Sequence, residues 1–295
     1  MSIFRKSTRF VSISVLLMGA IGCTPPPDAP ADLENLSEYI FAHMGDEDTA
    51  ELEAGLINLR TWLETGTNLE STQEGYTVND LKDESVNALD DVERSIRDSL
   101  YGAAVAHTYD HSMKELKQTM YLDDWSAVSE GTYDCYERIY ADASQPNCFL
   151  DSSCDQLSYV TDSVSSWAGA VDVTSISLGE VREIVVDGEA MVLQRTWLEG
   201  PSETSGILGD QVELYAKYFV NIMIPGSSEG ILRTTATWMD VQVGDIDNLD
   251  LVKNQIVSTM QGQNDIVTEW ITGDKDNEAA CLCSNFDYEE KECVE

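Results

Sequence analysis

The chain has 295 residues, of which 42% are apolar, so it is long enough to bury a large hydrophobic core. Its 54 acidic side chains outnumber 17 basic ones and give a formal net charge of −37 at pH 7. A surface this negative repels nucleic acid and anionic lipid head groups, which excludes a nucleic-acid-binding protein and favours cations or basic partners. The acidic residues are scattered along the chain rather than gathered in runs. This pattern is also typical of a protein whose surface charge serves only to keep it soluble in salty water.

The N-terminal stretch has the pattern of an export signal. An apolar run over residues 10–21 leads into Cys23, and three basic side chains precede it: Arg5, Lys6 and Arg9. The run is shorter than the ~20 residues that span a bilayer core, which favours a cleaved segment. The pattern resembles a bacterial lipoprotein signal. The resemblance implies that residues 1–22 are removed and that the Cys23 thiol is acylated; an ordinary secretory signal cut elsewhere is the alternative.

Residues 23–32 form a proline-rich tether. Four prolines fall within the seven positions after Cys23, and such a run is extended and fairly stiff. We expect it to hold the folded part away from the bilayer. Thr24 stands where enteric bacteria place the aspartate that retains lipoproteins at the inner membrane. The resemblance therefore implies an outer-membrane protein that meets the membrane through its N-terminal lipid.

Six further cysteines remain. They are Cys135, Cys148, Cys154, Cys281, Cys283 and Cys293. An even count in an exported chain predicts disulfides, whose pairing the sequence leaves open. The spacing suggests one group in an insertion at 142–156 and another in the tail. Cys281 and Cys283 could instead form half of a metal site, but no histidine lies nearby, so we predict disulfides and no metal.

The segment 33–101 is predicted to be helical. Apolar residues recur at steps of three and four between Leu33 and Gly66, and a second amphipathic pattern runs from Asn79 to Leu100. Such stripes normally bury themselves against the same chain, and we favour that interpretation. The alternative is that these helices hold another envelope protein.

Residues 102–273 are predicted to be largely antiparallel strands. β-prone segments lie at 103–109, 132–141, 181–186, 189–198, 211–224 and 231–243. Ser112 and Glu115 have the spacing of a capping box and predict a short helix after the first strand. Asp187-Gly188 predicts a two-residue hairpin turn.

Two elements in this region show clear periodicity. Residues 211–224 alternate, with Glu213, Lys217 and Asn221 on the face predicted to point outward. Residues 248–272 have the period of a long amphipathic helix. The predicted organisation is thus a signal at 1–22, a tether at 23–32, a helical segment at 33–101, an α+β domain at 102–273 and an acidic cysteine-containing tail at 274–295.

A strand, a short helix, an antiparallel strand series and a closing amphipathic helix follow one another between residues 102 and 273. This order resembles the START-like, helix-grip superfamily. The resemblance implies an α+β fold in which a curved sheet wraps the terminal helix around an apolar cavity, and it implies binding of a lipid or another apolar small molecule. A solid core without a usable cavity is the alternative.

Four residues are candidate ligand contacts. Arg195 and Arg233 lie within predicted strands of a chain that is poor in basic residues, and each stands near a tryptophan, Trp197 or Trp238. An arginine beside an aromatic ring can hold an anionic head group while an apolar tail is buried. Outward pairing of the arginines with carboxylates is the alternative.

Motifs for other chemistry are weak. Gly226–Gly230 fits a G-x-S-x-G nucleophile elbow, but a β-prone segment follows it where that mechanism needs a helix, so we predict a hairpin turn. His107 and His111 do not share a helical face, and the acidic runs near 245–250 and 274–278 lack an EF-hand glycine loop. We predict a non-enzymatic envelope protein without metal or cofactor.

Overall fold

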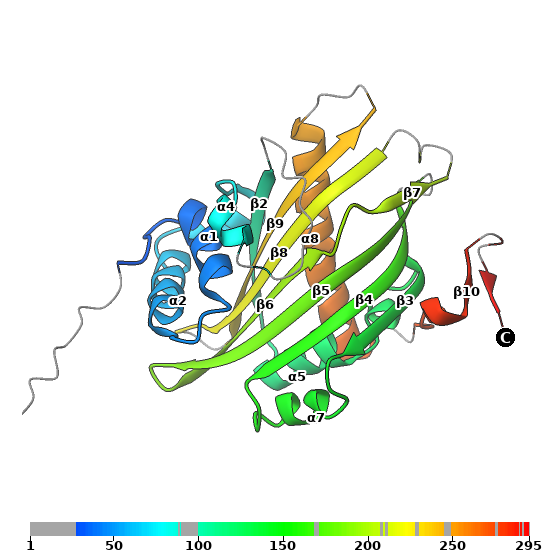
Figure 1. The fold of residues 1–295 in the computed structure, drawn as a ribbon. Coiled ribbons are helices and arrows are strands. Elements are labelled where there is room, and N and C mark those ends of the chain that lie inside the picture. The colour runs from blue at the N-terminus through cyan, green and yellow to red at the C-terminus, as the bar shows by residue number, and fades with distance from the viewer. Residues whose placement is uncertain are drawn as a thin grey trace, which may run out of the picture.

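The computed structural model (Figure 1) describes residues 28–87, 89, 100–167, 171–206, 209, 212–227, 230–244, 249–274, 277–288, 290 and 292–294. The signal segment and Cys23 lie outside these ranges, as does half of the helix predicted from Asn79 to Leu100. Within the described ranges, no helix is both long enough and apolar enough to cross a membrane.

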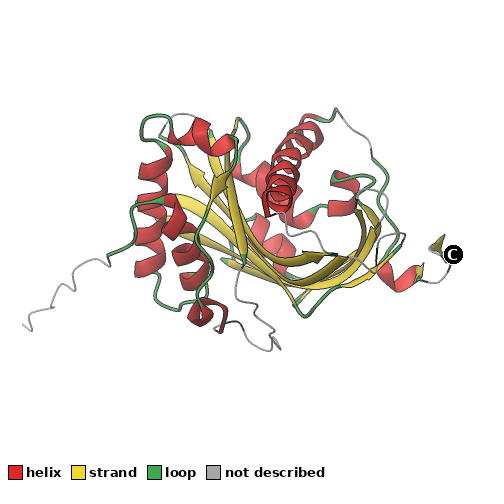
Figure 2. Cartoon of the chain, turned by 90° about the horizontal axis from the view of Figure 1, so that it is seen from above, coloured by secondary structure: helices red, strands yellow, loops and turns green. Residues whose placement is uncertain are grey.

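One antiparallel sheet forms the centre of the protein. Its strand order is β1-β2-β9-β8-β6-β5-β4-β3, and β7 pairs with β5. The strands are β1 Tyr76–Thr77, β2 Tyr101–Tyr109, β3 Tyr133–Tyr140, β4 Gln156–Trp167, β5 Val171–Val186, β6 Glu189–Leu198, β7 Glu203–Ser205, β8 Val212–Pro225 and β9 Ile231–Val243. The predicted hairpin joins β5 to β6, and both turn residues, Asp187 and Gly188, have positive φ. Figure 2 shows that the sheet is strongly curved.

Helices cover both faces of this sheet. The long helix α8, Leu249–Thr272, lies on the concave side, and the N-terminal helices α1, Leu33–His43, and α2, Ala50–Leu63, pack on the convex side (Figures 1 and 2). The shorter helices are α3 Asn68–Gln73, α4 Asp83–Asn87, α5 Met113–Lys117, α6 Trp125–Val128 and α7 Gln145–Leu150. The predicted α+β fold, a curved antiparallel sheet gripping a C-terminal helix, is confirmed.

The predicted capping box opens α5. The Ser112 side chain accepts a hydrogen bond from the backbone N–H of Glu115, and the Glu115 carboxylate accepts one from the backbone N–H of Ser112 at 2.8 Å. After Lys117 the chain continues as one π-helical turn over Gln118–Leu122, which carries Tyr121 beneath the sheet.

The apolar stripes of the N-terminal helices are buried in the chain's own core. Leu36, Ile40, Leu52 and Leu56 are fully buried. They share one cluster with the convex face of the sheet, to which Met191, Leu193, Trp197, Tyr218, Val220 and Trp238 belong. These helices therefore pack internally, as the sequence favoured.

The six cysteines form the three disulfides that the sequence predicted. Cys148–Cys154 closes the insertion around α7, and Cys281–Cys293 closes a loop within the tail. Cys135–Cys283 links β3 to the tail across a sequence separation of 148 residues. The tail is thus tied to the edge of the sheet rather than only to itself.

The two-sided covering of the sheet makes one sequence prediction wrong. A β-bulge between Leu214 and Ala216 shifts the register of β8, and beyond it Tyr218 and Ile222 face the N-terminal helices. Asn221, predicted to point outward, is 0% exposed. Lys217 of this strand lines the cavity on the inside of the sheet's curve, and Asn221 is buried on the same side, where it accepts a hydrogen bond from Arg233.

Candidate ligand-binding cavity

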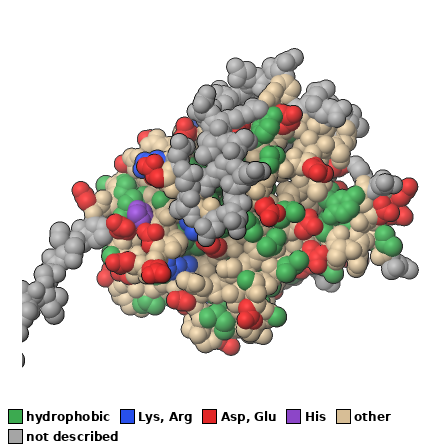
Figure 3. All heavy atoms as spheres, in the orientation of Figure 1, with side chains coloured by type: hydrophobic (Ala, Val, Ile, Leu, Met, Phe, Trp, Pro, Cys, Tyr) green, Lys and Arg blue, Asp and Glu red, His purple; other side chains and the backbone are tan. Residues whose placement is uncertain are grey.

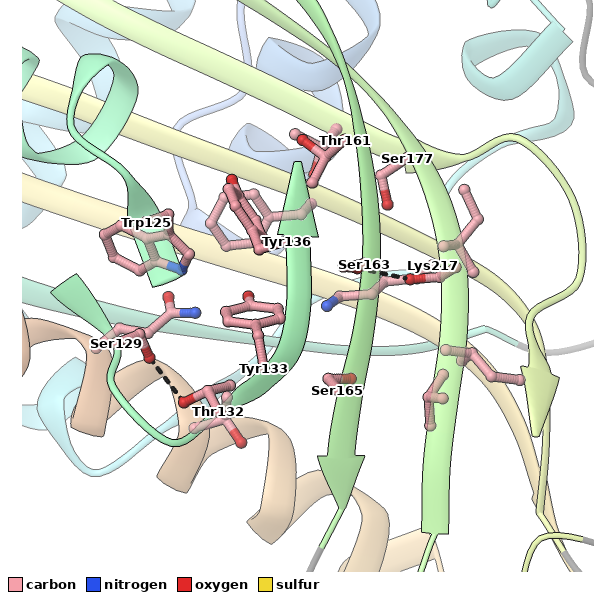
Figure 4. Close-up of a pocket in the computed structure, with 18 of the residues that line it drawn as sticks. Trp125, Ser129, Thr132, Tyr133, Tyr136, Thr161, Ser163, Ser165, Ser177 and Lys217 are labelled. Atoms are coloured by element: carbon pink, nitrogen blue, oxygen red, sulfur yellow. Dashed lines mark hydrogen bonds between the residues drawn. The ribbon is translucent and has the colours of Figure 1, made fainter. Parts of the chain in front are cut away.

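A cavity of about 460 Å³ lies between α8 and the concave face of the sheet (Figure 4). This volume falls within the range of ~300–1,000 Å³ typical of small-molecule sites. Strands β3, β4 and β5 form one wall, β6, β8 and β9 continue the curved surface, and Thr259, Gly262, Gln263 and Ile266 of α8 close the opposite side. The curvature of the sheet keeps this space open because one helix does not fill it.

Small hydroxyl side chains cover the wall made by β4 and β5. Alternate residues of a strand point to the same face, and on this face both strands carry serine or threonine. They are Thr161, Ser163 and Ser165 of β4, with Ser175 and Ser177 of β5. The hydroxyl oxygens of Ser163 and Ser175 lie 3.3 Å apart. The wall therefore offers a row of groups that can each donate or accept a hydrogen bond.

Three tyrosines and an arginine stand beside this wall. A register shift between Tyr133 and Cys135 allows Tyr133, Tyr136 and Arg138 of β3 to line the cavity together. Arg138 donates to the hydroxyl of Tyr136 at 2.6 Å and to the backbone carbonyl of Tyr121 at 2.7 Å. Its guanidinium carbon lies 4.7 Å from the ring centroid of Tyr159.

These tyrosines are neutral hydroxyls at physiological pH. Burial raises the pKa of Tyr159 to about 12, and it also raises the pKa values of Tyr133 and Tyr136. Arginine stays charged at any physiological pH. The Arg138 Nε is buried and has no hydrogen-bond partner among the residues that the structure describes.

A second arginine is held by neutral side chains. Arg233 of β9 is 2% exposed and donates to Asn221 Oδ1 at 2.8 Å, to Asn264 Oδ1 at 2.6 Å and to the Tyr109 hydroxyl at 3.0 Å. Asn221 in turn donates to the Tyr121 hydroxyl at 3.0 Å. This network joins β2, β8, β9 and α8, and it fixes the guanidinium at the cavity surface without neutralising its charge.

Lys217 of β8 is the third cation of the cavity. Figure 4 shows its side chain pointing into the space that Tyr133 and Tyr136 also face. Lys217 keeps accessible surface although protein surrounds it, so that surface belongs to the cavity. Burial lowers the pKa of its ammonium group. Among the ion pairs of the described residues, none involves Lys217, Arg138 or Arg233.

The four residues proposed from the sequence as ligand contacts do not come together. Arg233 lines the cavity, whereas Arg195, Trp197 and Trp238 lie on the convex face. Arg195 donates to Glu180 at 2.8 Å and to the Phe41 carbonyl at 3.2 Å. The sequence could not separate these residues because both faces of β6 and β9 are buried. An arginine on either face therefore has apolar neighbours.

Sequence reasoning missed Lys217, Arg138 and the tyrosines. For Lys217 a signal existed, since it is a lone cation in an alternating strand, but the same pattern is typical of a solvent-facing position. Tyr136 and Arg138 share a face by ordinary strand alternation, whereas Tyr133 joins them only through the bulge between Tyr133 and Cys135. A bulge is not readable from residue types alone.

The other motifs form no second site among the described residues. Ser227 lies in the turn between β8 and β9, so the G-x-S-x-G segment is followed by a strand, as predicted. The His107 ring packs edge to face against Tyr109 in β2, and burial lowers the pKa of His107. In the described part of the chain, one cluster has potential metal-ligand atoms close together. It consists of His43, Asp46 and Glu51 and lies at the surface. Asp245 and Asp247 lie outside the described residues.

Comparison with known proteins adds a likeness of fold. No protein-family model and no curated protein sequence matches the chain. Among solved structures, TTHA0849 from Thermus thermophilus is 8% identical, with 59% of this chain and 99% of that chain covered and a TM-score of 0.40. Norcoclaurine synthase from Thalictrum flavum is 12% identical, with 60% and 97% covered and a TM-score of 0.32. The human StarD13 lipid transfer and protein localization domain is 8% identical, with 57% and 74% covered and a TM-score of 0.34. The fold assignment rests on the strand order and the position of α8.

Proposed function

We propose that this chain is a non-enzymatic, lipid-anchored protein of the outer membrane whose α+β domain binds a small molecule with a large apolar part. The observation that carries the proposal is the cavity between α8 and the sheet, which is of ligand size. Apolar side chains line part of it: Val173, Leu198, Val212, Leu214 and Val241. An apolar chain or ring system would bury its surface against them, which is the main driving force for such binding.

The membrane anchor in this proposal is the acylated Cys23. Support comes from the signal pattern and from three disulfides, which persist in oxidising compartments outside the cytoplasm. Asn58 of α2 donates to the backbone carbonyls of Ala29 and Pro30 at 3.0 and 2.8 Å. The end of the tether is thereby fixed beside α2, on the convex side of the sheet.

A role in holding another envelope protein is the second candidate, and the packing of the helices counts against it. The apolar stripes of α1 and α2 contact the sheet and are not available to a partner. That role would have to use the acidic exterior instead.

The experiment measures binding of N-phenyl-1-naphthylamine, an uncharged apolar dye whose fluorescence rises in an apolar site. We expect saturable binding to the wild type. Ser175→Trp places a large ring in the cavity and should weaken binding by about tenfold or more, since most of the apolar contact is lost. Ile176→Trp is the matched control, because Ile176 is the next residue of β5 and is 43% exposed. A wild type that binds no dye, or equal binding by both variants, would contradict the proposal.

A further inference from the structure

The charge of the cavity differs in sign from the charge of the molecule. Acidic side chains are spread over the face seen in Figure 3, in keeping with a net charge of −37. The residues that line the cavity include Arg138, Lys217 and Arg233 but no aspartate or glutamate among those the structure describes. A chain with 17 basic side chains against 54 acidic ones thus has three cations and, in its described part, no carboxylate at this surface.

In the described part of the chain, no carboxylate forms an ion pair with Arg138, Lys217 or Arg233. Arg233 is bound by the oxygens of two asparagines and a tyrosine, and Arg138 by a tyrosine hydroxyl and backbone carbonyls. Lys217 has neither a hydrogen bond nor an ion pair with any residue in the described ranges. A cation that protein surrounds without a counter-charge costs folding free energy, and such groups are typical of sites that serve a ligand.

The groups around the cations suit an anion. Neutral tyrosine hydroxyls and the serine row of β4 and β5 can donate hydrogen bonds to oxygen atoms. Lysine binds an anion as a compact point charge with three donors, which imposes little on the shape of the partner. The polar and apolar parts of the cavity lining together describe an amphipathic ligand.

Resting on the ligand-binding function proposed above, we propose that the ligand carries an anionic group, a carboxylate, sulfonate or phosphate, and that Lys217 forms the ion pair with it. The Arg138 and Arg233 guanidiniums add positive potential at the cavity surface, and the hydroxyl wall supplies hydrogen bonds. The acidic exterior disfavours loose adsorption of anions elsewhere on the molecule. Selectivity for anionic over neutral ligands then comes from inside the cavity.

The test compares two dyes with the same ring system. 8-Anilinonaphthalene-1-sulfonate carries a sulfonate, and N-phenyl-1-naphthylamine does not. We expect Lys217→Met to weaken sulfonate-dye binding by about tenfold or more, as the loss of a charged hydrogen bond predicts, while neutral-dye binding changes by less than about threefold. Lys217→Arg retains the charge and should keep most of the affinity. Lys114→Met is the control, because Lys114 is 68% exposed on the outside.

A second measurement uses the wild type alone. Because burial lowers the pKa of Lys217, sulfonate-dye affinity should fall as the pH rises through that lowered pKa, while neutral-dye affinity stays constant. Within the described ranges, the other titratable or charged groups that line the cavity are Tyr133, Tyr136, Tyr159, Arg138 and Arg233, and α8 adds none among its lining residues. Burial raises the tyrosine pKa values, so they do not titrate in this window.

The outcomes separate the two proposals. If neither dye binds, the ligand-binding function itself is refuted. If both dyes bind and Lys217→Met weakens them equally or not at all, the cavity binds ligands but the anion pairing is wrong. Competition with decanoate, decyl phosphate and 1-decanol tests whether a competing ligand needs an anionic group. Displacement by both anions but not the alcohol supports the inference, and equal displacement by the alcohol overturns it.

Discussion

The network around Arg233 gives the prediction whose size follows most directly from the structure. Asn221→Leu removes the acceptor of the Arg233 Nε bond at 2.8 Å and the donor to Tyr121 at 3.0 Å and to Gln194 at 3.3 Å. A hydrogen bond to a charged group contributes about 1.5–3 kcal/mol and a neutral one about 1 kcal/mol. The buried leucine returns about 1.5 kcal/mol. We expect a net loss of about 2–3.5 kcal/mol in the free energy of unfolding.

Urea unfolding followed by circular dichroism, with the disulfides intact, measures this loss. Met223→Leu is the matched control, since Met223 is 0% exposed, lies two residues further along β8 and packs on the same side of the sheet. A volume-conserving swap of this kind costs about 1 kcal/mol or less. If Asn221→Leu were no more destabilising than Met223→Leu, the buried network would not hold Arg233 in place. Our account of how Arg233 is fixed at the cavity surface would then be refuted.

Three further predictions concern charge, anchoring and the tail. Burial lowers the folded-state pKa of Lys217, so its charged form opposes folding below that pKa and the cost disappears as the pH rises toward the unfolded-state value of ~10.4. Lys217→Met should therefore stabilise the empty protein in urea unfolding at pH 7, by an amount that shrinks at high pH; destabilisation at pH 7 would contradict this. Cys23→Ser should move the protein from the membrane pellet to the soluble fraction of lysed cells, and retention in the pellet would argue against the lipid anchor. Replacing Cys135 and Cys283 with serines should cost about 5 kcal/mol, and replacing Cys148 and Cys154 should cost about 2 kcal/mol, because the first disulfide closes a much longer loop. Equal losses in thermal unfolding would refute that reasoning.

Elements set by local chemistry could be predicted from the sequence. The Asp187-Gly188 turn requires positive φ at both positions, and that residue pair supplies it, so the β5–β6 hairpin was predictable. The capping box at Ser112 and the long period of α8 are signals of the same kind. Together with the order of the strands, they led to the correct α+β architecture.

The binding surface was harder to predict because the sheet is covered on both sides. Asn221 and Lys217 alternate with apolar residues, as side chains in water do, yet Lys217 lines the cavity and Asn221 is fully buried beside Arg233. Arg195 and Arg233 occupy similar sequence environments but opposite faces, and only the strand pairing separates them. The bulges in β3 and β8 change the alternation within a strand, and their positions depend on tertiary contacts.

Native mass spectrometry of the wild type, after incubation with decanoate, tests the central claim most directly. The account predicts a complex of one protein with one decanoate that is absent for Ser175→Trp and present for Ile176→Trp. Bare protein mass for the wild type at every decanoate concentration, together with no binding of the neutral dye, would show that the space beneath α8 is not a ligand site.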